Sequence, residues 1–425
     1  MQTVKSTEND RAVQRVVLDN GITLISIENQ AADLVAGRIF LKGAGTRWES
    51  RPLAGLFHLL ATVITKGTKR LSAVEIAERV ESIGAGLGAD TSVDYFVLSL
   101  KTVADDFPAI LELAGEIMRS PTFPEIEVER EKQITCQNIR SQMEQPFNVA
   151  FNQLREIMYP DHPYGLSILG TEESISKLTR FDLEQCHQTY FRPDNLVISL
   201  SGRLTLKEGI KLIERVFGDW KIPSTPLKAP QIPLLTPQPR QSITSQETQQ
   251  SIVMLGYLGA AVKSPDYAAL KLLNTYLGNG LSSRLFVELR EKRGLAYDVS
   301  AFYPTRLDTS QFVLYMGTAP NNTAIALEGL RTEAERLCHV QLTPEELQAS
   351  KNKLLGQYAL GKQTNAEMAQ LFGWYETLGL GIEFDLEFQA AVEQVSIEMA
   401  QQVASKYIVE PYISLVGPTA SVQLN

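Results

Sequence analysis

The sequence predicts an α+β protein of two homologous halves, each with a mixed, mostly antiparallel sheet covered by helices. Three observations support this prediction. The same order of strands and helices occurs twice along the 425 residues. The apolar strands follow one another in a hairpin-like pattern rather than as βαβ units, which favours antiparallel pairing. A proline-rich stretch separates the two copies, and the chain is too long for one hydrophobic core.

The first copy is predicted from its apolar runs and from the helical spacing of its apolar residues. It begins with an apolar strand and ends with a long charged helix. In order, the expected elements are a strand at 35–45, helices at 53–68 and 72–84, a strand at 93–103, an amphipathic helix at 107–119 and the long helix from 121.

The second copy repeats this order and shares small details with the first. Gly84 and Gly294 each close the second helix, and Pro124 and Pro344 each stand with a following acid at the first turn of the long helix. Proline costs no hydrogen bond there, and an acid suits the helix dipole. The expected elements are a strand at 251–261, helices at 266–280 and 282–294, a strand at 309–319 and helices at 322–337 and 342–358.

Between the copies, residues 219–244 contain six prolines. Proline fixes φ and cannot donate to a strand ladder, so this stretch predicts an extended surface linker. We therefore expect an N-terminal domain at 1–222, a linker at 223–245 and a C-terminal domain at 246–425.

Composition excludes several classes of protein. The formal net charge of −9 argues against a nucleic-acid partner and against a polybasic membrane surface. No apolar run reaches the roughly 20 residues of a membrane helix, and the N-terminus does not resemble a secretory signal. The three cysteines (Cys136, Cys186 and Cys338) form no CxxC pair. We therefore expect a reduced, cytoplasmic protein with no disulfide framework and no cysteine zinc site.

Several segments together resemble the pitrilysin-like metallopeptidases, the family of insulysin and the mitochondrial processing peptidases. These segments are LDNGITLI, GAGTRWES, GLFHLLATVITKGT, SIGAGLGADTSVDYFVLS, HPYGLSILGTEESISKLTRFDLEQCHQTYFRPDNLVISLSG and SSRLFVELREKRGLAYDVSAFY. The resemblance covers nearly the whole chain. It implies two homologous α+β halves that close, usually with a second pair of halves, around a peptide chamber.

The resemblance also implies where a zinc site would lie. Family peptidases carry H-x-x-E-H, in which two histidines one helical turn apart hold zinc and the glutamate is the general base. A later glutamate on the long helix completes the site. In this chain His58 is followed by Ala61 and Thr62, and Gln137 and Asn138 stand where the later acid is expected. The motif is therefore degenerate, and we expect His58 to be a packed histidine and the chain to bind no metal.

The C-terminal half keeps a pair that catalytic relatives use against the zinc-bound substrate. The matching residues are Arg290 and Tyr297, seven positions apart around Gly294. A phenol can donate to the oxyanion of an attacked peptide carbonyl, and a guanidinium can donate to the substrate backbone. The alternative is that Arg290 forms a surface ion pair with Glu288 or Glu291 and that Tyr297 is a half-buried strand residue.

The other candidates offer no chemistry. His162, His187 and His339 are not spaced as a pair on adjacent helical turns. The glycine-rich segment 84–92 follows a helix, the reverse of a phosphate loop, and is expected to be a turn. The shorter segment 278–284 is expected to be a turn and a helix start.

The resemblance implies a zinc-less, accessory subunit of a heterodimeric zinc endopeptidase. The chain alone would be inactive and would bind no cofactor. A homologous subunit with intact H-x-x-E-H would supply zinc, and both subunits would bind a peptide substrate. The isolated chain could also form a homodimer. The alternative is a structural scaffold like the core proteins of respiratory complexes, in which Arg290 and Tyr297 play no part in proteolysis.

Overall fold

The structure is a computed structural model that describes residues 2–5 and 12–422. It contains two compact units, and neither is a contiguous half of the chain. Residues 140–165 belong to the second unit, and residues 359–387 belong to the first. The division therefore differs from the domains expected at 1–222 and 246–425. The first unit comprises Met1–Ile139, Leu166–Gln231 and Ala359–Glu387, and the second comprises Arg140–Gly165, Ile232–Tyr358 and Phe388–Asn425.

The first unit is built on a seven-stranded sheet with the order β1-β2-β3-β7-β4-β6-β5. Every pair of neighbours is antiparallel except β3 and β7, so the sheet is mixed and mostly antiparallel. The strands are β1 (Gln2–Lys5), β2 (Ala12–Val17), β3 (Thr23–Glu28), β4 (Leu34–Leu41), β5 (Gly86–Thr91), β6 (Phe96–Val103) and β7 (Leu196–Gly202).

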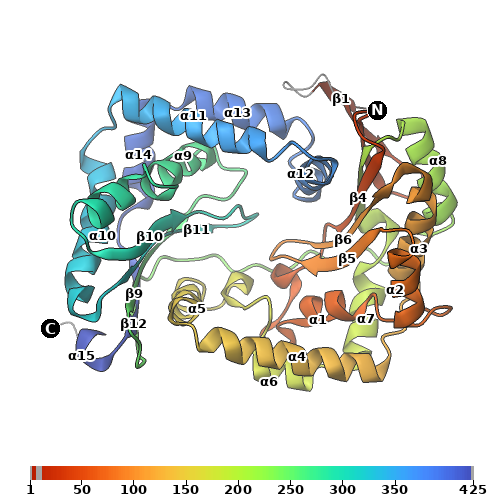
Figure 1. The fold of residues 1–425 in the computed structure, drawn as a ribbon, viewed down its shortest axis with the longest axis horizontal. Helices are drawn as coiled ribbons and strands as arrows, with labels where there is room; N and C mark the ends of the chain where they lie inside the picture. Colours follow the sequence, from red (N-terminus) through yellow and green to blue (C-terminus); the bar gives the residue numbers. More distant parts are fainter. Residues whose placement is uncertain (1, 6–11, 423–425) are drawn as a thin grey trace. The chain divides into compact units, whose positions relative to one another are not determined.

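The core of the first unit lies on one face of this sheet. Along β4, the residues Val35, Ile39 and Leu41 point into one apolar cluster with side chains of the covering helices. This alternation is what a strand with one face on a core requires. The helices of this face are α1 (Leu56–Val63), α2 (Ala73–Glu81), α3 (Phe107–Arg119), α7 (Arg180–Tyr190) and α8 (Leu206–Phe217), as Figure 1 shows.

The opposite face of the sheet is covered by α12 (Asn365–Thr377), a helix from the C-terminal part of the sequence. The helix packs closely against β4 and β7 because Gly373 has no side chain. A Cβ at this position would lie 2.5 Å from Cε2 of Phe40 and 2.8 Å from Cβ of Ser199. The second face of the sheet is therefore buried by residues distant in sequence, which explains the exchange of segments between the units.

Gly373→Ala is expected to destabilise the first unit by about 1–3 kcal/mol, because the added methyl overpacks this contact. The measurement is the free energy of unfolding by urea. Gly356→Ala is the matched control, since a Cβ at this helical glycine meets no atom within 4 Å. This control is expected to leave the stability unchanged or to raise it slightly through helix propensity. A Gly373→Ala protein as stable as its control would contradict the close packing of α12.

The second unit is built on a five-stranded sheet with the order β10-β11-β9-β12-β8. Only β12 and β8 run parallel. One face is covered by α5 (Pro146–Met158), which approaches at Gly256, where a Cβ would lie 2.5 Å from Sδ of Met158. The strands are β8 (Gln241–Ser245), β9 (Ser251–Gly259), β10 (Ala296–Phe302), β11 (Ser310–Thr318) and β12 (Tyr412–Gly417).

The remaining helices complete the two units. Within residues 2–5 and 12–422, no helix is long and apolar enough to cross a membrane. These helices are α4 (Glu125–Met143), α6 (Glu172–Lys177), α9 (Tyr267–Gly278), the π-helix η6 (Phe286–Glu291), α10 (Thr323–His339), α11 (Pro344–Leu360), α13 (Phe384–Gln394), α14 (Ile397–Tyr407) and α15 (Thr419–Val422).

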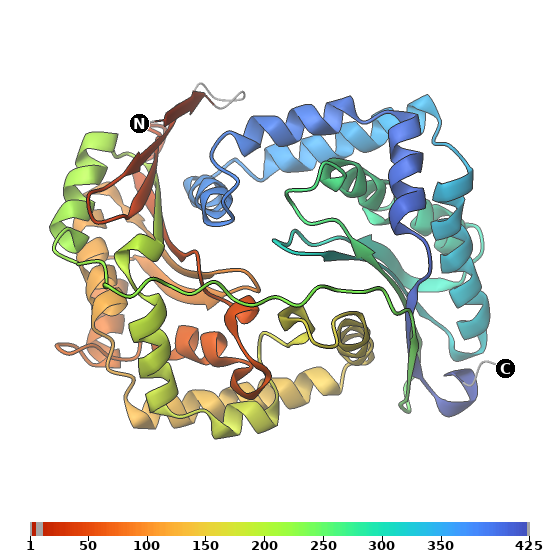
Figure 2. The same ribbon diagram turned by 180° about the vertical axis from the view of Figure 1, so that it is seen from behind.

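The predicted fold class is confirmed, because both units pair a mixed, mostly antiparallel sheet with helices. Between the end of α8 and the start of β8 the chain has no helix or strand, and Figure 2 draws it as an extended trace. The linker expected at 223–245 is too long by its last five residues, which form β8 beside β12. The sequence QSITS alternates in exposure, as an edge strand does.

Candidate functional site

Helix α1, where the zinc motif is expected, begins at a glycine that the fold requires. Gly55 is the N-cap with φ 87°, and a Cβ there would lie 2.7 Å from the carbonyl oxygen of Leu169. The buried carboxylate of Glu49 caps the helix. Its Oε2 accepts from the amide of Gly55 at 2.9 Å, and its Oε1 accepts from the amide of Phe57 at 2.8 Å. The carboxylate satisfies two amides that the helix leaves unpaired and lies at the positive end of the helix dipole.

The carboxyl group of Glu49 makes stability depend on pH. Burial raises its pKa to about 7 from the ordinary 4.5, although the two amide donors oppose the shift. The folded protein therefore keeps a proton that the unfolded chain releases. This contribution to stability is full below about pH 4.5 and is lost as the pH rises past about 7, with a fall of about 2 kcal/mol between about pH 5 and about pH 7.

Glu49→Gln should remove this dependence. From about pH 5 to about pH 7, we expect the wild type to lose about 2 kcal/mol of unfolding free energy relative to Glu49→Gln. Urea denaturation followed by circular dichroism at a series of pH values measures this difference. A difference that does not vary with pH would show that the carboxyl group titrates normally.

The residues present on α1 do not fit zinc. His58 is half-buried, and burial lowers its pKa although the charges of Asp90 and Glu131 oppose this. Ala61 is buried with a methyl group in place of the general base. The hydroxyl of Thr62 donates to the carbonyl of Leu59 at 2.9 Å, so it is used within the helix. One imidazole and an internally bonded hydroxyl cannot replace the three protein ligands of a catalytic zinc site.

Helix α4 contributes no ligand either. Gln137 and Asn138 are both exposed on it, while Glu131 is buried and lies 3.3 Å from Nζ of Lys66. Among the residues that the structure describes, no three His, Cys, Asp or Glu side chains gather in a way that could hold a metal ion.

Arg290 lies on an irregular helix of the second unit. Residues 286–291 form a π-helix, which is rare and occurs often at functional sites. Gly294 ends this segment with φ 62°, as the sequence predicts, and its amide donates to the carbonyl of Arg290 at 3.1 Å. The guanidinium carbon of Arg290 lies 4.9 Å from the ring centroid of Phe286. The side chain is exposed, and the ion pair considered with Glu288 is not formed, because that carboxylate pairs with Arg284 and Lys292.

Tyr297 lies in a β-bulge at the start of β10. Ala296 pairs with Thr318 and Asp298 pairs with Gly317, so Tyr297 is the extra residue between two ladder pairs. The side chain is 60% exposed, which rules out the half-buried strand position considered as its alternative. β10 is an edge strand of its sheet. Bulges of this kind redirect a side chain and are frequent beside active sites.

Two family models match the chain in series. The model described as insulinase (peptidase family M16) matches residues 24–172, and the model described as the peptidase M16 inactive domain matches residues 177–354. The chain belongs to peptidase family M16. Since α1 lacks the residues that hold and activate zinc-bound water, it is a member of the inactive type.

M16 relatives match over almost the full length. The chain is 28% identical over 420 residues to the uncharacterized zinc protease YmxG of Bacillus subtilis, with 96% of this chain and 99% of the relative covered. It is 26% identical over 416 residues to an uncharacterized zinc protease of Mycobacterium tuberculosis, covering 96% and 94%.

Solved structures of M16 type share the fold. A peptidase M16 inactive domain from Pseudomonas fluorescens has a TM-score of 0.89 at 25% identity, with 97% of this chain and 100% of that chain covered. A protease from Helicobacter pylori has a TM-score of 0.90 at 24% identity, covering 96% and 99%, a likeness that concerns the fold alone.

Two of the three other histidines of this M16 chain, His162 and His187, have structural contacts. The buried His162 accepts the amide of Tyr164 on Nδ1 at 3.0 Å. Nε2 of His187 lies 2.9 Å from the carbonyl oxygen of Met118, and burial lowers the pKa of this histidine to about 4. His339 is the last residue of α10. None of the three supplies the second imidazole that His58 lacks.

The glycine-rich segment 84–92 was expected to be a turn, and this prediction is wrong for most of its length. Gly86–Thr91 form β5, the edge strand of the first sheet, and pair antiparallel with β6. A Cβ at Gly88 would meet no atom within 4 Å, so the glycines here do not result from crowding. The signal in the sequence was the placement of the apolar residues Leu87 and Ala89 at alternate positions, and the glycines beside them obscured it because glycine has no side chain.

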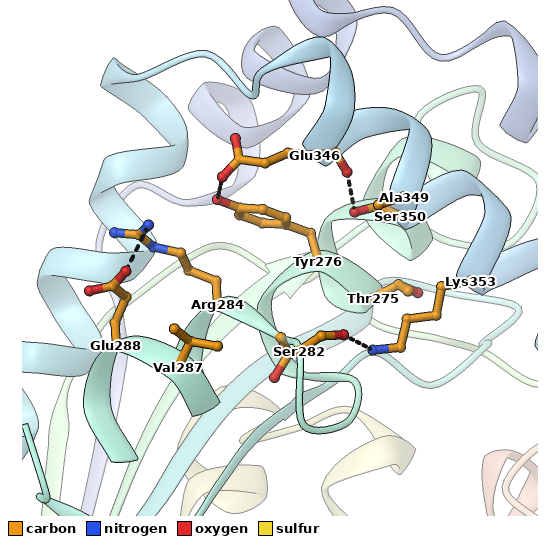
Figure 3. A pocket seen from close by; sticks show the side chains of 11 residues that line it. Thr275, Tyr276, Ser282, Arg284, Val287, Glu288, Glu346, Ala349, Ser350 and Lys353 are labelled. Atoms are coloured by element: carbon orange, nitrogen blue, oxygen red, sulfur yellow. Dashed lines mark hydrogen bonds and ion pairs between the residues drawn. The ribbon is translucent and has the colours of Figure 1, made fainter. Parts of the chain in front are cut away.

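The segment expected to be a turn at 278–284 lies beside a cavity of about 260 Å³ in the second unit (Figure 3). Its polar groups pair with one another. Arg284 lies 3.1 Å from Glu288, the hydroxyl of Tyr276 donates to Glu346 at 2.9 Å, and Nζ of Lys353 donates to Ser282 at 3.4 Å. The charges of Arg284 and Glu288 are matched within the cavity wall, whereas Lys353 is bound by the neutral oxygens of Asn279 and Ser282.

Proposed function

We propose that this chain is the non-catalytic, zinc-less subunit of a heterodimeric M16 metallopeptidase. The partner would be a homologous chain with an intact H-x-x-E-H motif, which supplies zinc and the general base. This chain would contribute Arg290 and Tyr297 to the binding of a peptide and to the stabilisation of its transition state. The observation that carries the proposal is the exposure of these two residues on irregular elements of a family member that has lost its own metal ligands.

The chemistry of the two side chains suits this role. The phenol of Tyr297 is a neutral donor, and it can give one hydrogen bond to the oxygen that becomes negative when water attacks a peptide carbonyl. The guanidinium of Arg290 carries a fixed positive charge, and its fork of donors can hold a backbone carbonyl or stabilise the same oxyanion. Neither residue needs a proton transfer, so the pair can act on a substrate bound to zinc of another subunit.

Irregular local structure supports the assignment. A π-helix and a β-bulge each disturb a regular ladder and cost stability, so they persist where they place a side chain usefully. Arg290 and Tyr297 each lie in such a segment, and the two segments are joined by the short turn at Gly294. An exposed tyrosine whose hydroxyl forms no hydrogen bond within residues 2–5 and 12–422 can serve as a donor to a substrate.

The remaining parts of the proposal concern partner and place. Both sheets keep the family fold, which supports association with a homologous chain. The surface that contacts this partner could also join two copies of the isolated chain as a homodimer. The absence of disulfide-forming pairs agrees with a cytoplasmic peptidase, since its three cysteines are all free.

Reconstitution with the partner tests the proposal. The candidate partner is the H-x-x-E-H chain that co-purifies with this protein from its native cell. Cleavage of a fluorogenic peptide library is measured for each chain alone and for the mixture, and zinc is measured by mass spectrometry. We expect this chain alone to be inactive and free of stoichiometric zinc, and the mixture to cleave peptides with one zinc per pair.

Two results would overturn the proposal. Peptide cleavage by this chain alone would make it a self-sufficient peptidase. A complex that forms but never gains activity, with any peptide of the library, would favour the structural scaffold.

A further inference from the structure

The sheet of the first unit carries an arginine on the face that α12 covers. Arg38 is the single charged residue of β4, LVAGRIFL, and it lies with Phe40 on the side opposite the main core. It lines a cavity of about 310 Å³ together with Tyr95 and with Gln370 and Trp374 of α12. All of these residues belong to the first unit.

The guanidinium of Arg38 is fixed by neutral acceptors. Its Nε donates to Oε1 of Gln370 at 3.2 Å, and its Nη1 donates to the carbonyl oxygens of Gly37 at 3.0 Å and Leu100 at 3.4 Å. Within residues 2–5 and 12–422, no carboxylate forms an ion pair with it. By contrast, the buried Lys362, close in sequence to the same cavity, pairs with Asp385 at 2.8 Å.

This arrangement leaves a positive charge without a counter-ion beside a cavity. Burial lowers the pKa of Arg38, but a guanidinium remains charged at neutral pH. An unpaired, partly desolvated cation costs stability, and a bound anion would offset that cost. Glu367 also lines the cavity, but its carboxylate accepts the amide of Thr364 at 2.8 Å as the cap of α12 and forms no bond with Arg38.

We propose that this cavity binds a carboxylate of a peptide ligand through Arg38. Nη2 of Arg38 and the side-chain amide of Gln370, whose oxygen already accepts from Nε, supply donors to the carboxylate. The rings of Tyr95 and Trp374 line the same cavity and pack against the carbon atoms beside the charge. The choice of a peptide rests on the proposed function. The carboxylate belongs either to an Asp or Glu side chain or to the C-terminus of the peptide.

The geometry favours a carboxylate over a simple structural role for Arg38. Three of its hydrogen bonds fix the orientation of the guanidinium, so little side-chain freedom is lost when a ligand binds. A methionine of similar volume could fill the space between β4 and α12 without a buried charge. The arginine therefore adds charge where packing alone does not need it.

Binding of four matched peptides to the purified full chain tests the inference. The nine-residue peptides carry Glu or Gln at the central position, each with a free or an amidated C-terminus. Affinity is measured by isothermal titration calorimetry. We expect the carboxylate that enters the cavity to raise affinity about tenfold or more over its amide, as one charge-assisted hydrogen-bonded pair can. The Glu–Gln pair and the free–amidated pair distinguish the two sources.

Substitution of Arg38 tests the residue itself. In Arg38→Met the preference for the carboxylate is expected to disappear, and in Arg38→Lys part of it is expected to remain. Arg180→Met is the control, because Arg180 is an exposed arginine of α7 that pairs with Glu184. Circular dichroism shows whether each variant is folded. If Arg38→Met does not fold, the four peptides on the wild type and on Arg38→Lys decide the question.

Equal affinity of the wild type for all four peptides would overturn the inference, as would an unchanged carboxylate preference in Arg38→Met. The outcome is separate from that of the proposed function, because no partner and no cleavage are involved. If the reconstituted pair is active but this chain shows no preference for carboxylate peptides, only the inferred carboxylate binding in the cavity is refuted. A carboxylate preference that depends on Arg38, in a chain that never activates a partner, would refute the proposed function alone.

Discussion

Tyr297→Phe in the reconstituted heterodimer is expected to lower kcat/KM for peptide cleavage about a hundredfold or more. Loss of one donor to an oxyanion removes on the order of 3 kcal/mol of transition-state stabilisation. Because the tyrosine hydroxyl meets the developing charge more strongly than the ground-state carbonyl, the loss should fall on kcat more than on KM. Because Tyr297 is exposed in its bulge, the substitution is expected to leave folding intact.

Arg290→Ala is expected to show a different balance. A guanidinium that holds the substrate backbone acts in the ground state as well as in the transition state, so KM should rise together with a fall in kcat. The double variant should lose less than the product of the two single losses if both residues hold the same oxygen.

Control variants separate this effect from general damage to the second unit. Tyr407→Phe removes a hydroxyl that donates to Asp266 at 2.9 Å, and Arg293→Ala removes an exposed arginine close in sequence to Arg290. Both are expected to keep activity near that of the wild type. Full activity of Tyr297→Phe and Arg290→Ala would instead favour the scaffold, in which association with a partner needs neither residue.

The sequence predicted the repeated elements because local signals determine them. The strand expected at 35–45 corresponds to β4 at Leu34–Leu41, and the helix expected at 72–84 corresponds to α2 at Ala73–Glu81. The second has a local start signal that explains its accuracy, since Ser72 and Glu75 form a reciprocal capping box.

The exchange of α5 and α12 between the units could not be predicted in this way. An amphipathic pattern shows that a helix has an apolar face, but it does not show which sheet that face will cover. The decisive contacts are between residues far apart in sequence, such as Gly373 against Phe40. A contiguous division at the proline-rich linker was therefore the natural expectation, and it places residues 140–165 and 359–387 in the wrong unit.

The sequence indicated which residues belong to the candidate site, but it did not indicate the local structure that holds them. The resemblance to the family indicated Arg290 and Tyr297. The π-helix and the bulge that hold them depend on one-residue shifts in the backbone hydrogen bonding, and the spacing of apolar residues in the sequence does not reveal such shifts. Glu49 and Arg38 were missed for a related reason. Arg38 left one signal, a charge inside an otherwise apolar strand, and the function of Glu49 as a helix cap depends on hydrogen bonds six and eight residues along the chain.

Grafting two ligands onto the first unit is expected to create a zinc site that the wild-type side chains do not supply. Thr62→His restores the second imidazole one helical turn after His58, because both positions lie in α1. Asn138→Glu restores the acid on α4, three positions after the buried Thr135 and hence on nearly the same face. The ion pair at 3.3 Å between Glu131 of α4 and Lys66, three residues after the end of α1, shows that α4 passes near the end of α1.

The expected result for the Thr62→His, Asn138→Glu chain is one zinc ion per chain with a dissociation constant of about 1 μM or tighter, since three protein ligands are then available. The lowered pKa of His58 favours this, because neutral imidazole is the form that binds metal. Zinc at about a hundredfold excess over that constant should add about 2.7 kcal/mol to the unfolding free energy. Calorimetric titration and urea denaturation measure the two effects, and His58→Ala in the grafted chain is the control that should abolish both.

This experiment bears directly on why the chain would need a partner. If the graft binds zinc and the wild type does not, the two helices have kept the geometry of a metal site, and only the side chains that supply the chemistry have changed. The general base would still be absent, because Ala61 remains, so the grafted chain should bind zinc without cleaving peptides. Failure of the graft would mean that α1 and α4 have moved apart in this lineage, and zinc bound by the wild type at α1 would contradict the assignment of an inactive first unit.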